Sequence, residues 1–380
     1  MRFSMAVSGV QEAMSIKYNT MVYELLRQGK RVIIMSLGEA YFDIPLWHMD
    51  DLKYPELYHY SHSRGIPELR ELLAGYFKSQ YQVAFDPARH ILITAGSKAA
   101  IHMTLMALLD PGDEVLIPEP AWVSYTEQVR LCHATPVGIP LGTPLEKYQG
   151  YVTPRTRVLI INNPHNPTGY VYSAQELQAL LDFAKRHNLT LLSDEAYSDF
   201  LVDDSFVSIG KLDPERKHSA IFNSISKNYG ISGWRIGYVI GNEEMIYQVL
   251  KVNQHLITCP ATILEFYVAR HFHEILKITK PQIHDVVRRR NHLVNYMKQL
   301  GMTALPGSAT FYTFVNIDPS RLSSEQFCTR LLQEKQVSAV PGLGYGKSCD
   351  RYIRVSVGTA STADNEFGAR CIREVIDASR

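Results

Sequence analysis

From about residue 90, short apolar runs alternate with segments of helical pattern, and this alternation constrains the fold more than any other feature of the chain. Nearly continuous apolar runs are typical of strands that are buried on both faces of a parallel sheet. We therefore predict an α/β fold with a mostly parallel central sheet and helices on both faces. The predicted strands are residues 91–94, 115–117, 157–161, 189–192, 220–222 and 236–240, and the helices between them include residues 98–109 and 174–187.

The pattern changes after about residue 260, where a long helical segment runs to residue 300, with an interruption expected at Pro281. It is followed by predicted strands at residues 311–315 and 352–356 and by helices at residues 324–336 and from residue 362 onward. This order indicates a smaller α+β domain, against which an N-terminal helix at residues 15–28 is expected to pack. We predict a large domain of residues 45–285 and a small domain formed by residues 1–44 and 286–380.

Lys227 lies just beyond one of the predicted strands, since the largely apolar run of residues 219–225 ends two positions before it. Most lysines are solvated surface groups. A lysine that is desolvated at such a position can instead act as a neutral amine nucleophile toward an aldehyde. Ser224 and Arg235 flank it in the sequence, and both side chains are suited to bind an anion beside the amine.

Two other predicted strands are followed by residues suited to ligand binding. Asp194 comes just after residues 189–192, where a carboxylate can either cap a helix or pair with a protonated ring nitrogen. Residues 95–98 (AGSK) join a strand to a helix, and the backbone N–H groups at a helix start bind anions. Ligands of parallel sheets bind beyond the carboxyl ends of the strands, so these segments are expected to lie together.

These segments together resemble the class I/II aminotransferase family, which depends on pyridoxal phosphate and has fold type I. Residues 224–237 (SISKNYGISGWRIG) resemble the family's cofactor-lysine signature. Residues 163–169 (NPHNPTG) and 194–197 (DEAY) resemble two further family elements, and they occur in the family's order. The resemblance covers essentially the whole chain. It implies an enzyme that moves an amino group between an L-amino acid and a 2-oxo acid.

The resemblance also implies a role for each candidate site residue. Lys227 would bond the cofactor aldehyde and move the proton at the reacting carbon, Asp194 would hold the ring nitrogen, and Tyr197 would donate to the phenolate oxygen. Asn166 would bond the same oxygen, and Trp122 would stack on the ring. The residues expected around the phosphate are Gly96, Ser97, Lys98, Ser224 and Arg235, together with Tyr60.

In the family, the tyrosine that corresponds to Tyr60 reaches the phosphate of the neighbouring subunit, so the resemblance implies a homodimer with shared active sites. It also implies that Gly38 and Arg354, with Asn166, contact the substrate, with Arg354 clamping its α-carboxylate. The chain departs from the family pattern at Ala40, where proline is usual, and at His59, His62 and Arg64. These departures leave the substrate side chain open.

The overall composition argues against several classes of function. With 39 basic and 38 acidic residues the net charge is +1, which does not favour nucleic acid as a partner. No apolar stretch is long enough to span a bilayer, and the N-terminus lacks the pattern of a signal peptide. The five cysteines are scattered, which favours the reducing cytoplasm. We expect no metal site, because even the neighbouring His271 and His273 point apart on a helix.

Two alternatives share the resemblance. The same cofactor chemistry can eliminate a side-chain substituent or close a ring, as lyases and cyclases of guanidino amino acids do on this fold. Only the altered loops at Ala40 and at residues 59–64 motivate this alternative. A regulator with an aminotransferase-like domain is the other, but such proteins normally carry a DNA-binding domain, for which no segment was identified.

Overall fold

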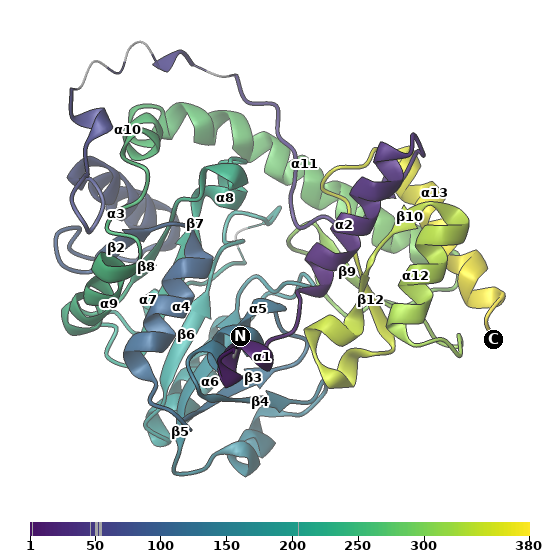
Figure 1. The fold of residues 1–380 in the computed structure, drawn as a ribbon, viewed down its shortest axis with the longest axis horizontal. Coiled ribbons are helices and arrows are strands. Elements are labelled where there is room, and N and C mark those ends of the chain that lie inside the picture. Colours follow the sequence, from purple (N-terminus) through teal and green to yellow (C-terminus); the bar gives the residue numbers. More distant parts are fainter. Residues whose placement is uncertain (2, 46, 50–51, 53–54, 204) are drawn as a thin grey trace.

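The computed structural model describes residues 1, 3–45, 47–49, 52, 55–203 and 205–380. At its centre lies a seven-stranded sheet (Figure 1). The strand order is β2 (Ile91–Thr94), β8 (Gly237–Ile240), β7 (Ser219–Ser224), β6 (Thr190–Asp194), β5 (Thr156–Asn162), β3 (Glu114–Pro118) and β4 (Thr135–Ile139). Strand β8 is antiparallel to both neighbours, and the other pairs are parallel. The mostly parallel α/β sheet predicted from the sequence is confirmed.

Edge strand β4 was missed by the sequence analysis. Its five residues include Pro136 and Gly138, which weaken the strand signal. Proline is tolerated there because β4 is hydrogen-bonded only to β3 and therefore has a free edge.

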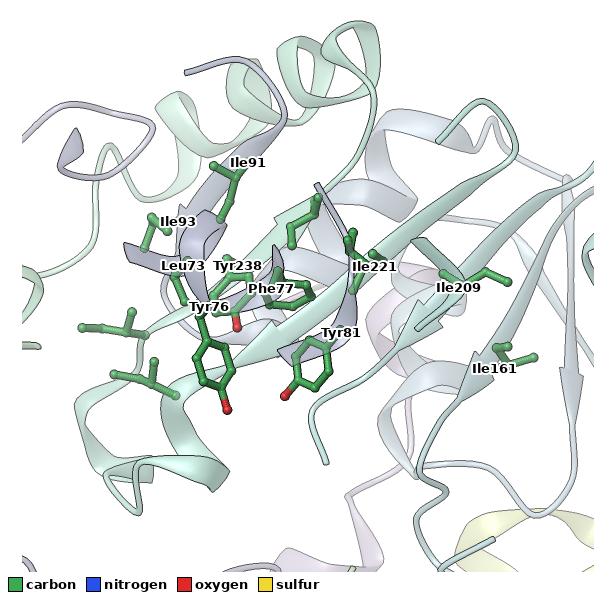
Figure 2. Packing of buried hydrophobic residues seen from close by; sticks show 14 of the residues in the cluster. Leu73, Tyr76, Phe77, Tyr81, Ile91, Ile93, Ile161, Ile209, Ile221 and Tyr238 are labelled. Carbon is green, nitrogen blue, oxygen red and sulfur yellow. The ribbon is translucent and has the colours of Figure 1, made fainter. Parts of the chain in front are cut away.

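Helices cover both faces of this sheet because successive side chains of each strand point to opposite sides. Ile91 and Ile93 belong to one buried cluster, while Leu92 between them belongs to another. The first cluster, shown in part in Figure 2, includes side chains of α3 (Pro67–Tyr81), α6 (Ala174–Arg186) and α10 (Thr262–Arg270). The second includes side chains of α4 (Ser97–Leu108), α5 (Ser124–Leu131) and α9 (Glu243–Leu256).

A second group of elements lies beside the large sheet (Figure 1). A three-stranded antiparallel sheet has the order β11 (Val340–Pro341), β12 (Tyr352–Ser356) and β9 (Tyr312–Asn316). Helices α12 (Ser324–Lys335) and α13 (Thr362–Asp377) pack with it, and β1 (Ile33–Ile34) pairs with β10 (Val337–Ser338). The N-terminal helix α2 (Met14–Arg27) joins this group, where the Tyr18 hydroxyl donates to the Glu325 carbonyl at 3.0 Å.

Helix α11 (Phe272–Gln299) connects the two groups and differs from the sequence prediction. It continues through Pro281, so the interruption expected there is wrong, and the break falls instead at His271. Pro281 removes only one N–H donor, and buried side chains before and after it keep the helix in place. Phe272 packs with the large sheet and Ile283 with the second group. The predicted domain boundary at residue 285 lies inside this helix, and the division into two domains stays a prediction.

The remaining described elements are short. They are the helices α1 (Met5–Ser8), α7 (Ile209–Leu212) and α8 (Ile225–Asn228), and 3₁₀ turns at Pro55–Tyr58, Leu145–Tyr151, Ser232–Trp234, Gly342–Tyr345 and Lys347–Cys349. Among the helices within the described ranges, none is long and apolar enough to cross a membrane.

Candidate active site

A cavity of about 280 Å³ lies at the carboxyl end of the central strands. Side chains from the large sheet and from the second group of elements line it together. Most of the candidate site residues identified in the sequence line this cavity, namely Gly38, Ser97, Lys98, Trp122, Asn166, Asp194, Tyr197, Ser224, Lys227, Arg235 and Arg354. Residues nearly 320 positions apart in the chain therefore meet at one site.

Lys227 projects from α8, the single helical turn that directly follows strand β7. Its amine donates a hydrogen bond of 2.6 Å to the Gly38 carbonyl, and it lies 5.8 Å from the centre of the Tyr197 ring. Burial lowers the pKa of Lys227 to about 8, although Glu39 opposes this shift. About a tenth of the amine is thus uncharged at pH 7, far more than for an ordinary lysine, and an uncharged amine is the nucleophilic form.

Asp194 is the last residue of strand β6, and its side chain is buried below the cavity. The Tyr125 hydroxyl donates to its Oδ2 atom at 2.7 Å, and the Ala196 backbone N–H donates to its Oδ1 atom at 3.2 Å. Burial raises the pKa of Asp194 to about 6, while the Tyr125 bond acts in the opposite direction. Asp194 can therefore remain a carboxylate at neutral pH and pair with a cationic ring nitrogen.

Two further polar groups face the same space. The Tyr197 and Tyr312 hydroxyls are 3.0 Å apart, and burial raises the pKa of Tyr197 well above its ordinary value, so its hydroxyl keeps its proton. The Asn166 backbone is held by Asn162, whose Oδ1 atom accepts from the Asn166 N–H at 2.6 Å. The Asn166 side-chain oxygen is buried and has no hydrogen-bond partner within the described chain.

A positively charged cradle lies at the start of α4. Gly96 has φ +88°, a backbone conformation that favours glycine, and a Cβ atom there would lie 2.3 Å from Nη2 of Arg235, so the backbone and the guanidinium are close together. The Arg235 guanidinium donates to the Ser226 hydroxyl at 3.3 Å and to the Ser232 carbonyl at 2.5 Å. Burial and the charge of Arg235 lower the pKa of Lys98. In the part of the chain that the structure describes, no ion pair joins Lys98 or Arg235 to an acidic side chain. The charge of both side chains is therefore available to bind an anion.

Arg354 is buried in strand β12 on the opposite wall of the cavity. Its guanidinium lies 4.4 Å from the centre of the Tyr312 ring and 5.6 Å from that of Tyr345. One nitrogen donates to the Ser36 carbonyl at 2.6 Å, whereas its buried Nε has no partner among the described residues. A buried guanidinium without an acidic partner is suited to bind a carboxylate.

Two candidate residues are not among those that line the cavity, namely Gly96, which packs against Arg235, and Tyr60. Tyr60 is 85 % exposed, and it is absent from the residues that line the site. Its loop is nevertheless fixed, since the Thr262 hydroxyl accepts from the Ser61 N–H at 3.1 Å and donates to the His59 carbonyl at 2.8 Å. The loop therefore holds the Tyr60 side chain on the surface of the chain.

The structure also adds site residues that the sequence analysis missed, principally Tyr125, Tyr312 and Glu39. Tyr125 follows Trp122 by three residues, and this spacing was the only available signal. Tyr312 shares a face with Arg354 because of the strand register, in which Arg354 is opposite Phe314 and Ser356 is opposite Tyr312. Glu39 accepts a short hydrogen bond from the Ser232 hydroxyl. No sequence pattern shows this pairing.

The model of the family named "Aminotransferase class I and II" matches residues 48–370 of the chain. The chain belongs to this aminotransferase family. The aspartate aminotransferase of Pyrococcus abyssi is 33 % identical over 351 residues, which is 89 % of this chain and 90 % of that protein. The aromatic-amino-acid aminotransferase 2 of Thermococcus litoralis is 32 % identical over 368 residues, covering 94 % and 95 %.

Solved aminotransferase structures agree with the fold. The aspartate aminotransferase of Thermus thermophilus with maleate superimposes with a TM-score of 0.90 at 31 % identity, covering 99 % of this chain and 100 % of that one. Fold type I is therefore confirmed, and the chain is a transaminase of a family that depends on pyridoxal phosphate. These comparisons offer no support for the lyase or cyclase alternative.

The cavity fits pyridoxal phosphate by the chemistry of its own side chains. The cradle of Lys98 and Arg235 suits a phosphate, Asp194 suits a ring nitrogen, and the Asn166 side chain, which lines the cavity, has an amide N–H group that can donate to a ring oxygen. The Lys227 amine suits an aldehyde. Within the described residues, no cluster of three or more His, Cys, Asp or Glu side chains is arranged to hold a metal ion.

The hydrogen bond from Tyr125 to Asp194 leads to a first prediction. We expect Tyr125→Phe to raise the pKa of Asp194 above its value of about 6, because the variant removes a donor that favours the carboxylate. The acidic limb of the pH–rate profile for transamination should move to higher pH, and the rate at pH 6 should fall about tenfold, the equivalent of about 1.4 kcal/mol. Profiles from pH 5 to 9 measure the shift.

The control is Tyr172→Phe. Tyr172 is a partly buried tyrosine that packs against the first cluster, whereas Tyr125 belongs to the second. A coincident acidic limb in Tyr125→Phe and wild type contradicts the role of Tyr125.

Proposed function

We propose that this cavity is the transaminase active site and that it holds pyridoxal phosphate with Lys227 as the cofactor lysine. The observation that carries the proposal is the buried Lys227 amine, with its pKa lowered to about 8, in the same cavity as a cationic cradle and a buried carboxylate. Bound pyridoxal phosphate supplies an aldehyde and an electron-withdrawing ring that stabilises negative charge at the substrate Cα atom.

The side chains of the chain then have distinct tasks. Lys98, Arg235, Ser97 and Ser224 hold the phosphate end, together with the backbone around Gly96. Asp194 accepts from the ring nitrogen and keeps it protonated, and Tyr125 keeps Asp194 ionised. Tyr197 and Asn166 bond the ring oxygen, while Trp122 packs on the ring face.

The proton transfer is assigned to Lys227. The uncharged Lys227 amine would take up the proton from the substrate Cα atom and, once charged, would give that proton back within the same cavity. A pKa of about 8 suits both directions near neutral pH, because the amine can accept and release a proton at little cost. The hydrogen bond to the Gly38 carbonyl orients the amine toward the cavity.

Substrate orientation is assigned to the wall opposite the cradle. Arg354 binds the α-carboxylate of the amino acid or 2-oxo acid with its fork of donors, and the Tyr312 ring supports the guanidinium. Gly38 and Asn166 border the same space. Specificity for the substrate side chain falls to the surrounding loops, including the segment with Ala40.

A half-reaction experiment tests this function against the alternative of elimination or cyclisation. The cofactor-loaded enzyme is mixed with single L-amino acids in the absence of any 2-oxo acid. Transamination should stop after one equivalent of 2-oxo acid per subunit, and adding a 2-oxo acid should restart it. Continuous product formation without an acceptor would point to elimination or ring closure. If no amino acid reacts, the proposed function is wrong.

We also propose that the chain forms a homodimer in which Tyr60 reaches the phosphate of the partner subunit. An aromatic side chain that is 85 % exposed on a fixed loop favours such a contact. Exposed apolar groups lie nearby on α9 and just after it, namely Leu256 and Ile257, and Asn253 of the same helix bonds the Ser63 carbonyl at 3.0 Å. Exposed apolar surface of this kind marks protein–protein contacts.

Subunit exchange tests the shared site. Tyr60→Phe should weaken cofactor retention by about 1.5–3 kcal/mol, the value of one hydrogen bond to a charged group. Mixing this variant with Lys227→Ala should form heterodimers in which one site carries both lesions and the other carries neither. Activity should then exceed that of either parent under limiting cofactor. If exchange is demonstrated by mass spectrometry and no activity returns, Tyr60 does not serve the partner's site.

A further inference from the structure

The helix that carries Lys227 is only one turn long. Helix α8 has four residues, Ile225–Asn228, and helices of this length are not stable on their own. Its position therefore depends on contacts from other parts of the chain. An asparagine stands on each side of the turn, with Asn223 near the end of β7 and Asn228 at the end of the helix.

Both asparagines bond to the same short segment. The Asn228 side-chain amide donates to Oδ2 of Asp199 at 2.7 Å, and the Asn223 side-chain amide donates to the Ser198 hydroxyl at 3.0 Å. Ser198 and Asp199 directly follow Tyr197 in the sequence. Asn223 and Asn228 thus connect both ends of α8 to the segment that directly follows Asp194–Tyr197.

Asp199 is fixed from the other side by two tyrosines of α3. The Tyr76 and Tyr81 hydroxyls donate to its Oδ1 atom at 2.6 Å and 2.5 Å. Burial, and then the charge of Asp199, raise the pKa of both tyrosines, so both hydroxyls keep their protons and remain donors. Three hydrogen bonds to one carboxylate hold it in a single orientation, since bonds to a charged acceptor are the stronger kind.

We propose that Asp199 is a positioning residue for the reaction: through Asn228 it fixes α8, and with it the Lys227 amine, relative to Asp194 and Tyr197. The inference rests on the proposed role of Lys227 as the cofactor lysine. Asp199 itself contacts neither substrate nor cofactor. Its effect follows from geometry, because a misplacement of about 1 Å of a reacting group can cost about 10²-fold in rate.

Three variants test the proposal. Asn228→Ala removes only the link between Asp199 and α8, and Asp199→Asn keeps the size of the side chain but replaces an acceptor oxygen with a donor. Each should lower kcat about 10- to 100-fold and leave the KM for the amino acid within about twofold. Tyr81→Phe removes another bond to Asp199 while the link to Asn228 remains, so its kcat should stay within twofold of wild type.

A second readout uses the cofactor-free protein. Hydrogen exchange of the backbone amides of residues 225–230 should be at least tenfold faster in Asn228→Ala than in wild type, and unchanged in Tyr81→Phe. Reductive methylation with formaldehyde, followed by peptide mass spectrometry, should show a different pH midpoint for the Lys227 amine in Asn228→Ala. A purely structural role of Asp199 would lower the Tm without moving this midpoint.

The outcomes separate the possibilities. The proposal is overturned if Asn228→Ala keeps the wild-type kcat and exchange rate, or if Tyr81→Phe is as damaging as Asn228→Ala. The double variant of Asp199 and Asn228 should be no worse than the worse single variant, because both act through one bond; additive losses would count against it. If Asp199→Asn does not fold, the kcat and the exchange rate of Asn228→Ala alone decide whether the proposal stands. Failure of the proposed function is recognised separately, since wild type would then transaminate no L-amino acid, or Lys227→Ala would keep full turnover.

Discussion

Lys227→Ala should lose nearly all transaminase activity. The variant removes the side chain proposed both as the nucleophile toward the cofactor aldehyde and as the group that moves the proton at the substrate Cα atom. Loss of the proton transfer alone is expected to lower kcat by about 10²- to 10⁴-fold. Single-turnover measurements on variant loaded with pyridoxal phosphate give this number directly, because slow cofactor release does not affect them.

The cofactor should still bind to this variant, since the cradle of Lys98 and Arg235 and the Asp194 carboxylate remain. Equilibrium dialysis measures that binding, so loss of activity can be separated from loss of cofactor. Lys227→Arg keeps a cation but no usable base, and it should be as inactive as the alanine variant. Lys185→Ala, an exposed lysine of α6, is the matched control. Near-wild-type turnover of Lys227→Ala would remove the lysine from the mechanism.

Arg354→Gln should have the next largest effect. Truncating one partner of a buried charge pair costs about 2–5 kcal/mol, which corresponds to a loss in kcat/KM for an L-amino acid of about 30-fold to several thousand-fold. The loss should depend on the substrate carboxylate, because Arg354 is a buried guanidinium without an acidic partner in the described chain. The variant should therefore discriminate poorly between an amino acid and the amine that lacks its carboxylate.

The ratio of kcat/KM for these two substrates is the decisive measurement. Wild type should prefer the amino acid strongly, and the preference should collapse in Arg354→Gln. The control is Arg351→Gln. Arg351 lies just before the same strand, but its guanidinium pairs with the exposed Asp318 at 2.6 Å, so this variant should keep the wild-type ratio of the two kcat/KM values. If Arg354→Gln slows both substrates equally, Arg354 supports the fold of the cavity rather than the carboxylate.

The central sheet could be predicted because its strands carry local signals. Residues 91–94 and 157–161 are largely apolar runs of strand length, and residues 352–356 alternate apolar and polar side chains; they form β2, most of β5 and β12. The sequence prediction is wrong where the local preference of a residue and its tertiary context disagree. Pro281 is a helix breaker by preference, yet the buried residues around it keep α11 continuous. Edge strand β4 contains Pro136, which no central strand would tolerate.

The candidate site was predictable for residues that follow strands, because parallel strands bring their carboxyl ends to one edge of the sheet. Asp194, Lys227 and Ser97 reach the cavity in this way. Tyr312 and the hydrogen bond between the Lys227 amine and the Gly38 carbonyl could not be predicted, since strand register and loop conformation bring these groups together. The Tyr60 contact stays a prediction, because it concerns a second subunit.

The pairing of β1 with β10 has a consequence for biosynthesis. Ile33 is paired with Val337, so the 303 residues between them must be made before the two strands of this small sheet can pair. At about 5–20 residues per second, translation of that stretch takes about 15–60 s. During this interval the N-terminal segment has no partner strand, and the Ser36 carbonyl cannot yet meet Arg354. The wall that contains Arg354 is consequently among the last parts of the molecule to form, and a nascent chain that already contains Lys227 still lacks the group proposed to orient the substrate.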